Sequence, residues 1–423
     1  MLESTESLLP IFGNDLEKQP QVVCVGMEET SLDELCQLLS TLGVKCDTRV
    51  LVSSKRINPA TYIGKGKIDE VVKIIEEQPI RAVILDVELS PNQLRNLEKE
   101  FKLPILDRPG VILEIFSKHA RSRESKTQVA LARLQYLLPR LTHFWTHFER
   151  QRGGSPGSRG MGEKQIEVDR RLVKGRITVL RGRLAAIERE RKVQRAGRKD
   201  VLKVALVGYT NAGKSTLLNA LTQSDVRVEN KLFATLDASV RTLDPNSHPP
   251  IVAIDTVGFI SKLPHSLVAS FRSTLEELEE ADLLVHVVDA SHPQALEQLQ
   301  VTEKVLKELR LDEKPKMTVL NKIDQVPEGI SRNRCRVLSP GAQTLSALNP
   351  KDVRILRDAI LAHFRQELEV FEIMVPYSEG KLEAQIYTHG IVELNRPLEK
   401  GTYYRLRIDE TWAKKLGLER FRL

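Results

Sequence analysis

One stretch of the chain combines glycine, lysine and serine at a fixed spacing. It reads Gly208-Tyr209-Thr210-Asn211-Ala212-Gly213-Lys214-Ser215, follows an apolar run at 201–207 and precedes a helical pattern at 214–221. In such a strand–loop–helix segment, backbone N–H groups and the positive end of the helix surround phosphate. The spacing predicts that Lys214 reaches the β- and γ-phosphates of a nucleotide and that Ser215 ligates Mg²⁺. Thr216 and the eight residues of the loop are therefore candidate nucleotide-binding residues.

A second group of polar residues indicates which base is bound. Asn321-Lys322-Ile323-Asp324 ends an apolar run at 317–320, the strand position at which α/β sheets bind ligands. Asp324 can accept hydrogen bonds from both the ring N–H and the exocyclic amine of guanine, whereas adenine presents a different pattern. Asn321 would hold neighbouring loops together, and the stem of Lys322 would lie over the base. The tripeptide Ser346-Ala347-Leu348 would supply the Ala347 N–H to the guanine oxygen, so we expect GTP and GDP as ligands.

Two more segments carry residues suited to the γ-phosphate. Asp255-Thr256-Val257-Gly258 ends the run at 251–254 and predicts that Asp255 holds Mg²⁺ through a water and that the Gly258 N–H contacts the γ-phosphate. In the segment 233–237, Thr235 is the candidate for the second Mg²⁺ ligand on a mobile loop, although it is also one loop threonine among several. We assign catalytic roles to Lys214, Thr235 and Gly258, in a GTPase whose loops respond to the γ-phosphate.

Two further residues, Phe259 and Asn211, bear on the expected rate of GTP hydrolysis. Phe259 stands where many regulatory GTPases place a glutamine that orients water, and a phenyl ring cannot do so. We therefore predict slow intrinsic hydrolysis that a partner stimulates. Asn211 resembles an asparagine that helps some GTPases bind a stimulating K⁺, but an asparagine that caps the loop explains it equally well.

Basic residues are concentrated in the middle of the chain. The 423 residues carry 64 Lys+Arg and 57 Asp+Glu, a net charge of +7, but 22 basic and 7 acidic residues lie between Lys118 and Lys199. This segment alone contributes +15, so the rest of the chain sums to −8. Such a distribution is typical of proteins that bind nucleic-acid backbones, and a solvated Arg-rich helix surface is the alternative. Our candidate RNA contacts are Arg150, Arg152, Arg159, Lys164, Arg170 and Arg171, of which the last two could instead belong to an internal salt-bridge cluster.

The hydrophobic pattern divides the chain into five parts. A tail at 1–20 precedes a small α/β domain at 21–110, which has strands at 21–26, 48–52 and 82–86 and helices opening at Ser31, at 68–78 and at 90–101. The turn 107–110 closes it. Residues 111–199 form an antiparallel helical hairpin, because apolar residues recur every three or four positions on both sides of a glycine-rich tip at 153–162. A flexible basic tip on a stiff stalk suits a narrow, negatively charged cavity, and an ordinary linker is the alternative.

The remaining two parts follow the hairpin. Residues 200–368 predict a doubly wound, mostly parallel GTPase sheet with strands at 201–207, 251–255, 283–289, 317–321 and 335–338. A small C-terminal α+β module at 369–423 has predicted strands at 384–388 and 402–408 and a turn at Gly390. The fold class is therefore α/β throughout most of the chain.

Composition excludes several other classes. The chain is 41% hydrophobic and 29% charged, as globular proteins are, and its longest apolar runs are far shorter than the roughly 20 residues that span a bilayer. The acidic residues Glu3, Glu6 and Asp15 argue against a signal peptide. The four cysteines show no CxxC or zinc spacing, which favours reduced thiols. We expect a cytoplasmic monomer with no membrane insertion.

Several motifs of the sequence resemble those of a known family. The chain is similar to the HflX-type GTPases of the Obg–HflX group through its nucleotide-binding motifs and through four stretches outside them, 62–67 (YIGKGK), 107–108 (DR), 125–128 (SKTQ) and 162–171 (GEKQIEVDRR). The resemblance implies binding to the 50S subunit and its rRNA, with the hairpin tip directed towards the peptidyl-transferase centre. It also implies separation of stalled ribosomes into subunits and hydrolysis stimulated by the ribosome.

Two other functions stay open at this point. An RNA-remodelling, helicase-like enzyme would be stimulated by naked RNA, and a GTPase switch acting on a protein partner would respond to neither RNA nor ribosomes.

Overall fold

The computed structural model describes residues 21–52, 57–141, 159–196, 201–222, 232–233, 235–237, 239–244, 250–262, 277–327 and 338–423. They belong to two compact units. The first comprises Met1–Val193 with Glu229–Asp237 and Ser261–Thr274, and the second comprises Gln194–Val228, Ala238–Ile260 and Leu275–Leu423. The predicted tail at 1–20, Arg150, Arg152 and positions 153–158 of the predicted tip lie outside the described residues.

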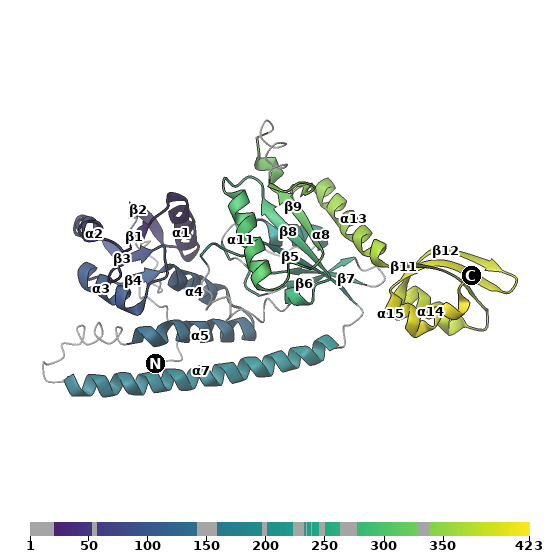
Figure 1. Ribbon diagram of the computed structural model, residues 1–423, viewed down its shortest axis with the longest axis horizontal. Helices are drawn as coiled ribbons and strands as arrows, with labels where there is room; N and C mark the ends of the chain where they lie inside the picture. The colour runs from purple at the N-terminus through teal and green to yellow at the C-terminus, as the bar shows by residue number, and fades with distance from the viewer. Residues whose placement is uncertain are drawn as a thin grey trace. The chain divides into compact units, whose positions relative to one another are not determined.

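A four-stranded parallel sheet organises the start of the first unit, in the order β2-β1-β3-β4. Helices separate the strands along the chain and cover both faces of such a sheet, which explains why the two central strands, β1 and β3, are almost continuously apolar. Figure 1 shows these elements in sequence: β1 (Gln21–Gly26), α1 (Glu29–Leu42), β2 (Lys45–Leu51), α2 (Lys65–Glu77), β3 (Ile80–Leu85), α3 (Pro91–Phe101) and β4 (Ile105–Asp107).

Two local predictions in this unit are wrong. Ser31 does not open α1, because the helix begins at Glu29 and places Ser31, which is buried, in its first turn. The residues 107–110 do not form a turn. Asp107 instead caps helix α4 (Arg108–His119) by accepting a hydrogen bond from the Gly110 N–H at 3.0 Å, and Pro109 occupies the first turn. Asp, Pro and Gly favour both turns and helix starts, so the sequence alone does not separate them.

The described part of the hairpin consists of α5 (Arg123–Leu137), the short 3₁₀ segment η2 (Leu138–Arg140) and α7 (Arg159–Ala196), and α5 and α7 run side by side in Figure 1. Leu131 of α5 packs against Val173, Ile177 and Leu180 of α7. The three α7 residues belong to the predicted apolar seam, whereas the buried residue of α5 is the neighbour of the predicted Ala130. Arg191, near the end of α7, pairs with Glu124 at the start of α5 at 2.8 Å, so the two helices are antiparallel. Residues 159–162 belong to α7 rather than to the glycine-rich tip, which corrects the predicted boundary.

The second unit is built on a six-stranded sheet in the order β10-β9-β8-β5-β7-β6. All of its neighbouring strands are parallel except β6, which is antiparallel to β7 and was not predicted. The elements are β5 (Leu202–Gly208), α8 (Lys214–Thr222), β6 (Ser239–Asp244), β7 (Ile251–Asp255), β8 (Leu283–Asp289), α11 (Ala295–Glu308), β9 (Lys316–Asn321), η3 (Ile323–Gln325), β10 (Gln343–Thr344) and α13 (Pro350–Glu367). Of the predicted strand 335–338, positions 335–337 lie outside the described residues and Leu338 is not in a strand.

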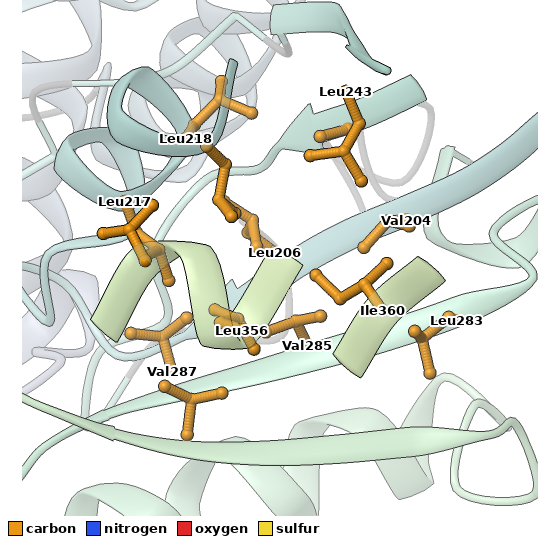
Figure 2. Packing of buried hydrophobic residues seen from close by; sticks show 14 of the residues in the cluster. Val204, Leu206, Leu217, Leu218, Leu243, Leu283, Val285, Val287, Leu356 and Ile360 are labelled. Atoms are coloured by element: carbon orange, nitrogen blue, oxygen red, sulfur yellow. The ribbon is translucent and has the colours of Figure 1, made fainter. Parts of the chain in front are cut away.

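Helices cover both faces of this sheet. Figure 2 shows Leu217 and Leu218 of α8 and Leu356 and Ile360 of α13 packed over Val204, Leu206, Val285 and Val287 of the central strands. On the opposite face, Val288 packs with Ala295 and Leu299 of α11. The sheet is therefore held rigidly between two helical layers, and its strand ends provide fixed positions for loops.

The last part of the second unit is a three-stranded antiparallel sheet in the order β11-β13-β12, with its own apolar core. Its elements are β11 (Glu369–Val375), α14 (Gly380–His389), β12 (Gly390–Leu398), β13 (Gly401–Ile408), α15 (Glu410–Leu416) and η4 (Leu418–Phe421). The predicted strand at 384–388 is wrong: these residues lie in α14, where Ile386 is buried against the sheet. Among the described helices, none is long and apolar enough to cross a membrane.

Candidate nucleotide-binding site

The candidate site lies at the carboxyl ends of the parallel strands of the second unit. The loop 208–213 follows β5 and leads directly into α8. Gly213 has φ +92°, in the left-handed region, and a Cβ there would lie 2.3 Å from Asn321 Nδ2. Only glycine fits this position without displacing a neighbouring loop. The predicted strand–loop–helix context is thus confirmed.

Lys214 is buried at the start of α8. Its ammonium group donates hydrogen bonds to the carbonyl oxygens of Gly208 at 3.1 Å and Tyr209 at 2.8 Å, so the side chain folds back over the loop. Burial lowers the pKa of Lys214 to about 8, and the negative charge of Asp255 partly opposes this shift. Burial disfavours the charged ammonium, and the negative charge of a triphosphate beside it would offset that cost.

Ser215 and Asp255 bring two oxygen atoms together. The Ser215 hydroxyl donates to Asp255 Oδ2 at 2.6 Å, and the Asp255 side chain at the end of β7 is buried. A hydroxyl and a carboxylate are the hard oxygen ligands that Mg²⁺ prefers. The pair therefore has the chemistry required to hold this ion, as the sequence predicted for Ser215 and Asp255.

Gly258 approaches the phosphate-binding loop closely. A Cβ at Gly258 would lie 2.8 Å from the Thr210 Cα and 2.9 Å from the Lys214 ammonium nitrogen. The next residue, Phe259, forms a parallel bridge with Tyr209. The structure thus joins the segment 255–259 to the loop through backbone contacts that the sequence did not predict.

The predicted bridging role of Asn321 is present in the structure. Its amide nitrogen donates to the Ala212 carbonyl at 2.9 Å, and its amide oxygen accepts from the Ala347 N–H at 3.0 Å. The side chain therefore joins the phosphate-binding loop to the segment 346–348. The Ala347 N–H has Asn321 as its acceptor, so a guanine oxygen would have to share or replace it, and the predicted contact with guanine stays a prediction.

Lys322 and Asp324 follow at the end of β9. Lys322 has φ +59°, and its ammonium pairs with Asp289 Oδ2 at 2.7 Å. Asp324 is exposed, and no side chain pairs with its carboxylate within the described residues. Asp289, which the sequence analysis did not select, positions Lys322; its place at the carboxyl end of β8 was the signal that could have found it.

The other predicted nucleotide-binding residues also lie around this loop. Asn211 has φ +62° and an exposed side chain. The left-handed backbone is one reason for an asparagine here, and it leaves the question of K⁺ open. Tyr209, Thr210 and Ala212 are buried, Thr216 is half-buried in α8, Ser346 is buried, and Leu348 is 74% exposed.

Thr235 belongs to the first unit, together with the residues around it. Phe233 packs edge-on against Phe116 of α4, with ring centroids 4.8 Å apart. Asp237 accepts hydrogen bonds from the N–H groups of Arg121 and Ser122 at 3.0 and 3.1 Å. Burial alone would raise the pKa of the Asp237 carboxyl, but the hydrogen bonds from the Ser122 hydroxyl and from these N–H groups lower it below its ordinary value. Thr235 itself is half-buried. Its role as a Mg²⁺ ligand stays a prediction.

Ser261 and Lys262, which follow Phe259 along the chain, also belong to the first unit. The Ser261 hydroxyl donates to Glu34 of α1 at 2.6 Å, and the Lys262 ammonium donates to Ser31 at 2.7 Å and to Asp86 at 2.9 Å. Arg108, fully buried, pairs with Asp86 at 2.6 Å and with Glu34. These contacts fix Ser261 and Lys262 to α1 and to Asp86 within the first unit.

Three family models match the chain. A model described as "GTP-binding GTPase N-terminal" matches residues 29–117, one described as "GTP-binding GTPase Middle Region" matches 119–198, and one described as "50S ribosome-binding GTPase" matches 203–322.

The GTPase HflX of Magnetococcus marinus is 43% identical over 367 residues, 85% of this chain and 84% of the relative. The GTPase HflX of Escherichia coli is 39% identical over 374 residues, 88% of each chain. A GTP-binding protein of Sulfolobus solfataricus, solved with GDP, is 26% identical, with a TM-score of 0.43, and the match covers 81% of this chain and 98% of the other.

The phosphate-binding loop, the carboxylate beside Ser215 and the Asn321–Asp324 segment, together with the match to the GTPase family model and the HflX relatives, define a P-loop GTPase that binds and hydrolyses GTP. The HflX relatives match 85% and 88% of this chain, far more than the residues of the GTPase family model. The chain belongs to the HflX family.

Proposed function

We propose that this HflX-family GTPase binds the large ribosomal subunit and its rRNA through the α5–α7 hairpin and, when GTP is bound, separates stalled or idle ribosomes into subunits. Support for the partner comes from the match to a model described as a 50S ribosome-binding GTPase. A ribosomal partner also implies a cytoplasmic location, and a monomer is sufficient for this activity.

The observation that carries the rRNA contact is the exposed surface of α7. Between 167 and 191, two acidic side chains are exposed, Glu167 and Glu190, against six basic ones, Arg170, Arg171, Lys174, Arg181, Arg183 and Arg189. Within the described residues, Arg170 and Arg171 form no ion pair, which favours the surface role over an internal salt-bridge cluster. The side chains of Arg159 and Lys164 lie outside the described set. A row of unpaired cations along a helix suits a phosphate backbone.

The nucleotide chemistry follows from residues already placed. Lys214 would contact the β- and γ-phosphates, the Gly258 N–H the γ-phosphate, and Asp324 the guanine base. Ser215 and Asp255, with Thr235, would hold Mg²⁺, which neutralises phosphate charge when it is bound. Because Phe259 cannot orient water, hydrolysis would be slow until the ribosome aligns the water or supplies charge.

The first experiment measures GTP hydrolysis by the protein alone, with naked rRNA and with purified 50S subunits at a fixed moderate salt concentration. A large increase with 50S alone supports the proposal. A larger increase with naked rRNA would favour an RNA-remodelling enzyme instead, and no increase with either would favour a protein partner. Replacement of 153–162 by a short Gly/Ser linker tests the predicted tip together with the first turn of α7, and it should abolish the stimulation.

A charge variant tests α7 directly. The triple substitution Arg170→Gln, Arg171→Gln and Lys174→Gln removes three exposed cations without changing the buried seam of the hairpin. The salt dependence of 50S binding should weaken, with the slope of log K against log salt reduced by roughly 2 to 3. The control removes three exposed cations elsewhere, by Lys351→Gln, Lys381→Gln and Lys400→Gln, and should retain the slope. Equal losses in the two variants would contradict a specific role for α7.

Ribosome separation needs its own readout. Light scattering of intact ribosomes should fall when the protein is added with a non-hydrolysable GTP analogue, and it should not fall with GDP. If 50S stimulates hydrolysis but intact ribosomes stay associated, then the binding part of the proposal stands and the separation part is wrong.

A further inference from the structure

Three cysteines that are distant in the sequence converge in the first unit. Cys24 lies on β1, Cys36 on α1 and Cys46 on β2, and their sulfur atoms all lie within 4.8 Å of one another. Cys24 is fully buried, whereas Cys36 and Cys46 are partly exposed. The β1–α1–β2 crossover places the helix over the two neighbouring parallel strands, and this connection explains the convergence.

The three sulfur atoms are not evenly spaced. Cys36 Sγ and Cys46 Sγ lie only 2.7 Å apart. Two thiolates on one zinc ion would be roughly 3.7 Å apart, since each lies about 2.3 Å from the ion. The non-bonded contact is also shorter than the ~3.5–4.0 Å at which heavy atoms usually rest. The spacing therefore favours a bond between these two sulfurs over a shared metal ion.

The surroundings of Cys36 favour a reactive thiolate. Hydrogen bonds from the Cys24 and Cys46 thiols lower the pKa of Cys36 well below its ordinary value, and the positive charge of Arg49 lowers it further. Arg49 is the β2 partner of Cys24 in the sheet register and forms an ion pair with Asp33, so its position is fixed. A partly exposed cysteine beside a cation, with a second thiol in reach, is the arrangement found in oxidant-sensitive cysteines.

We propose that Cys36 and Cys46 form a reversible disulfide when the protein meets hydrogen peroxide. The Cys36 thiolate attacks one oxygen of the peroxide, the O–O bond breaks, and the products are a Cys36 sulfenic acid and hydroxide (water, once protonated). The Cys46 sulfur then attacks the Cys36 sulfur, the S–O bond breaks, and hydroxide leaves and takes up the Cys46 proton as water. The two thiols lose two electrons, which reduce the peroxide. A dithiol reductant restores the reduced pair.

Cys24 has a different part in this scheme. Its complete burial excludes it from attack by a polar oxidant, and hydrogen bonding to Cys36 and Cys46, together with burial, raises the pKa of its thiol. The pKa of the Cys46 thiol is also raised, but Cys46 is partly exposed and its sulfur lies 2.7 Å from that of Cys36, so exposure and distance distinguish it from Cys24. We therefore infer that Cys24 donates a hydrogen bond to the Cys36 thiolate and does not enter the disulfide.

The test uses the full chain, reduced and then freed of reductant. After exposure to hydrogen peroxide, remaining thiols are alkylated, and the protein is digested without reduction and analysed by mass spectrometry. Wild type, Cys24→Ser and Cys335→Ser should each give a peptide pair joined through Cys36 and Cys46. Cys36→Ser and Cys46→Ser should lose this species, and dithiothreitol should remove it from the others. A dominant link through Cys24, or stable sulfinic acid at Cys36 without any link, would overturn the proposal.

A second measurement leaves all cysteines in place. Arg49→Gln should shift the pH profile of the rate of disulfide formation to higher pH, because the positive charge of Arg49 contributes to the lowered pKa of Cys36. Arg81→Gln is the matched control, since it removes an exposed cation from β3 of the same sheet, and its rate should equal that of wild type. Metal analysis of the purified protein tests whether the three cysteines bind a metal ion instead. One equivalent of zinc or copper that is lost in Cys24→Ser would show a metal site and contradict the proposal.

Discussion

The backbone of Phe259 is hydrogen-bonded to that of Gly208, with the Phe259 N–H donating to the Gly208 carbonyl at 3.1 Å. The Phe259 carbonyl in turn accepts from the Thr210 N–H at 2.7 Å. The phenyl ring is only 3% exposed, so this residue contributes its main chain and its packing rather than a polar group. The segment 255–259 and the phosphate-binding loop are thus joined directly, and a displacement of one moves the other.

The lowered pKa of Lys214 predicts how GTP affinity depends on pH. In the protein without nucleotide, the ammonium loses its proton as the pH rises through about 8. Bound phosphates favour the charged form, so binding takes up a proton above this pH. We expect the Kd for GTP to be flat from about pH 7 to 8 and to rise towards tenfold per pH unit above it. Titration calorimetry in two buffers of different ionisation enthalpy measures both effects.

The lowered pKa of Lys214 also makes the stability of the folded protein depend on pH. The folded pKa of about 8 lies below the unfolded value of 10.5, so the unfolded chain binds more protons between these values. This group therefore makes the nucleotide-free protein more stable as the pH rises through that window. Lys214→Arg is the control for both effects, because arginine stays protonated. A wild-type Kd that stays constant to about pH 9 would contradict the assignment.

Gly213→Ala should weaken nucleotide binding at least tenfold. The added Cβ would lie 2.3 Å from Asn321 Nδ2 at a left-handed φ of +92°, so the Asn321 bridge or the loop must shift. We also expect the free energy of unfolding to fall by about 1–3 kcal/mol. Gly182→Ala, on α7 with no heavy atom within 4 Å of the added Cβ, should bind GTP normally and gain about 0.5–1 kcal/mol. Fluorescent-nucleotide titration and denaturant unfolding of both variants provide the comparison.

Asp324→Asn should shift the base preference from guanine to xanthine. The exposed Asp324 carboxylate offers two acceptors to the ring N–H and the exocyclic amine of guanine, whereas an amide offers one acceptor and one donor. Xanthine carries a carbonyl where guanine carries the amine and so matches the amide. Competition between GTP and XTP should favour GTP in wild type and XTP in the variant, by at least tenfold in each case. Retention of the GTP preference would show that other groups select the base.

The hairpin seam provides a prediction on local stability. Ile177, which is 6% exposed, packs in the cluster with Leu131, whereas Val179 on the same helix is 47% exposed. Ile177→Ala should reduce the local opening free energy of α5 and α7 by about 2–4 kcal/mol. Val179→Ala should change it by no more than about 0.5 kcal/mol. Amide hydrogen exchange of the two helices in the full chain reports the difference, and equal protection in the two variants would contradict the packing.

Buried strands were the most predictable elements. The apolar runs at 21–26, 251–255 and 283–289 match β1, β7 and β8 residue for residue, because strands covered on both faces have little polar content. The nucleotide-binding residues were equally accessible to sequence reasoning, since the chemistry fixes their spacing within one loop. The edge strand β6 (Ser239–Asp244) carries polar residues and has no such pattern.

Features that depend on distant contacts were missed. Residues 384–388 alternate like a strand, but the packing of Ile386 against the C-terminal sheet places them in a helix. The cysteine cluster has sequence separations of 12 and 10 residues, which match no metal or redox pattern, and only the order of β1 and β2 brings the thiols together. The ion pairs of Arg108 join positions 34 and 86 for the same reason.

The packing of Phe233 against Phe116 has a consequence for synthesis. Leu232, Phe233 and Leu236 are each no more than 5% exposed, and they belong to the unit that begins at the N-terminus. The partner surface, including α4, leaves the translating ribosome first, so it can already be folded when these three side chains emerge. A shortened chain that starts at residue 200 would lack Phe116 and would leave this apolar segment uncovered. It should aggregate in a way that the whole chain does not.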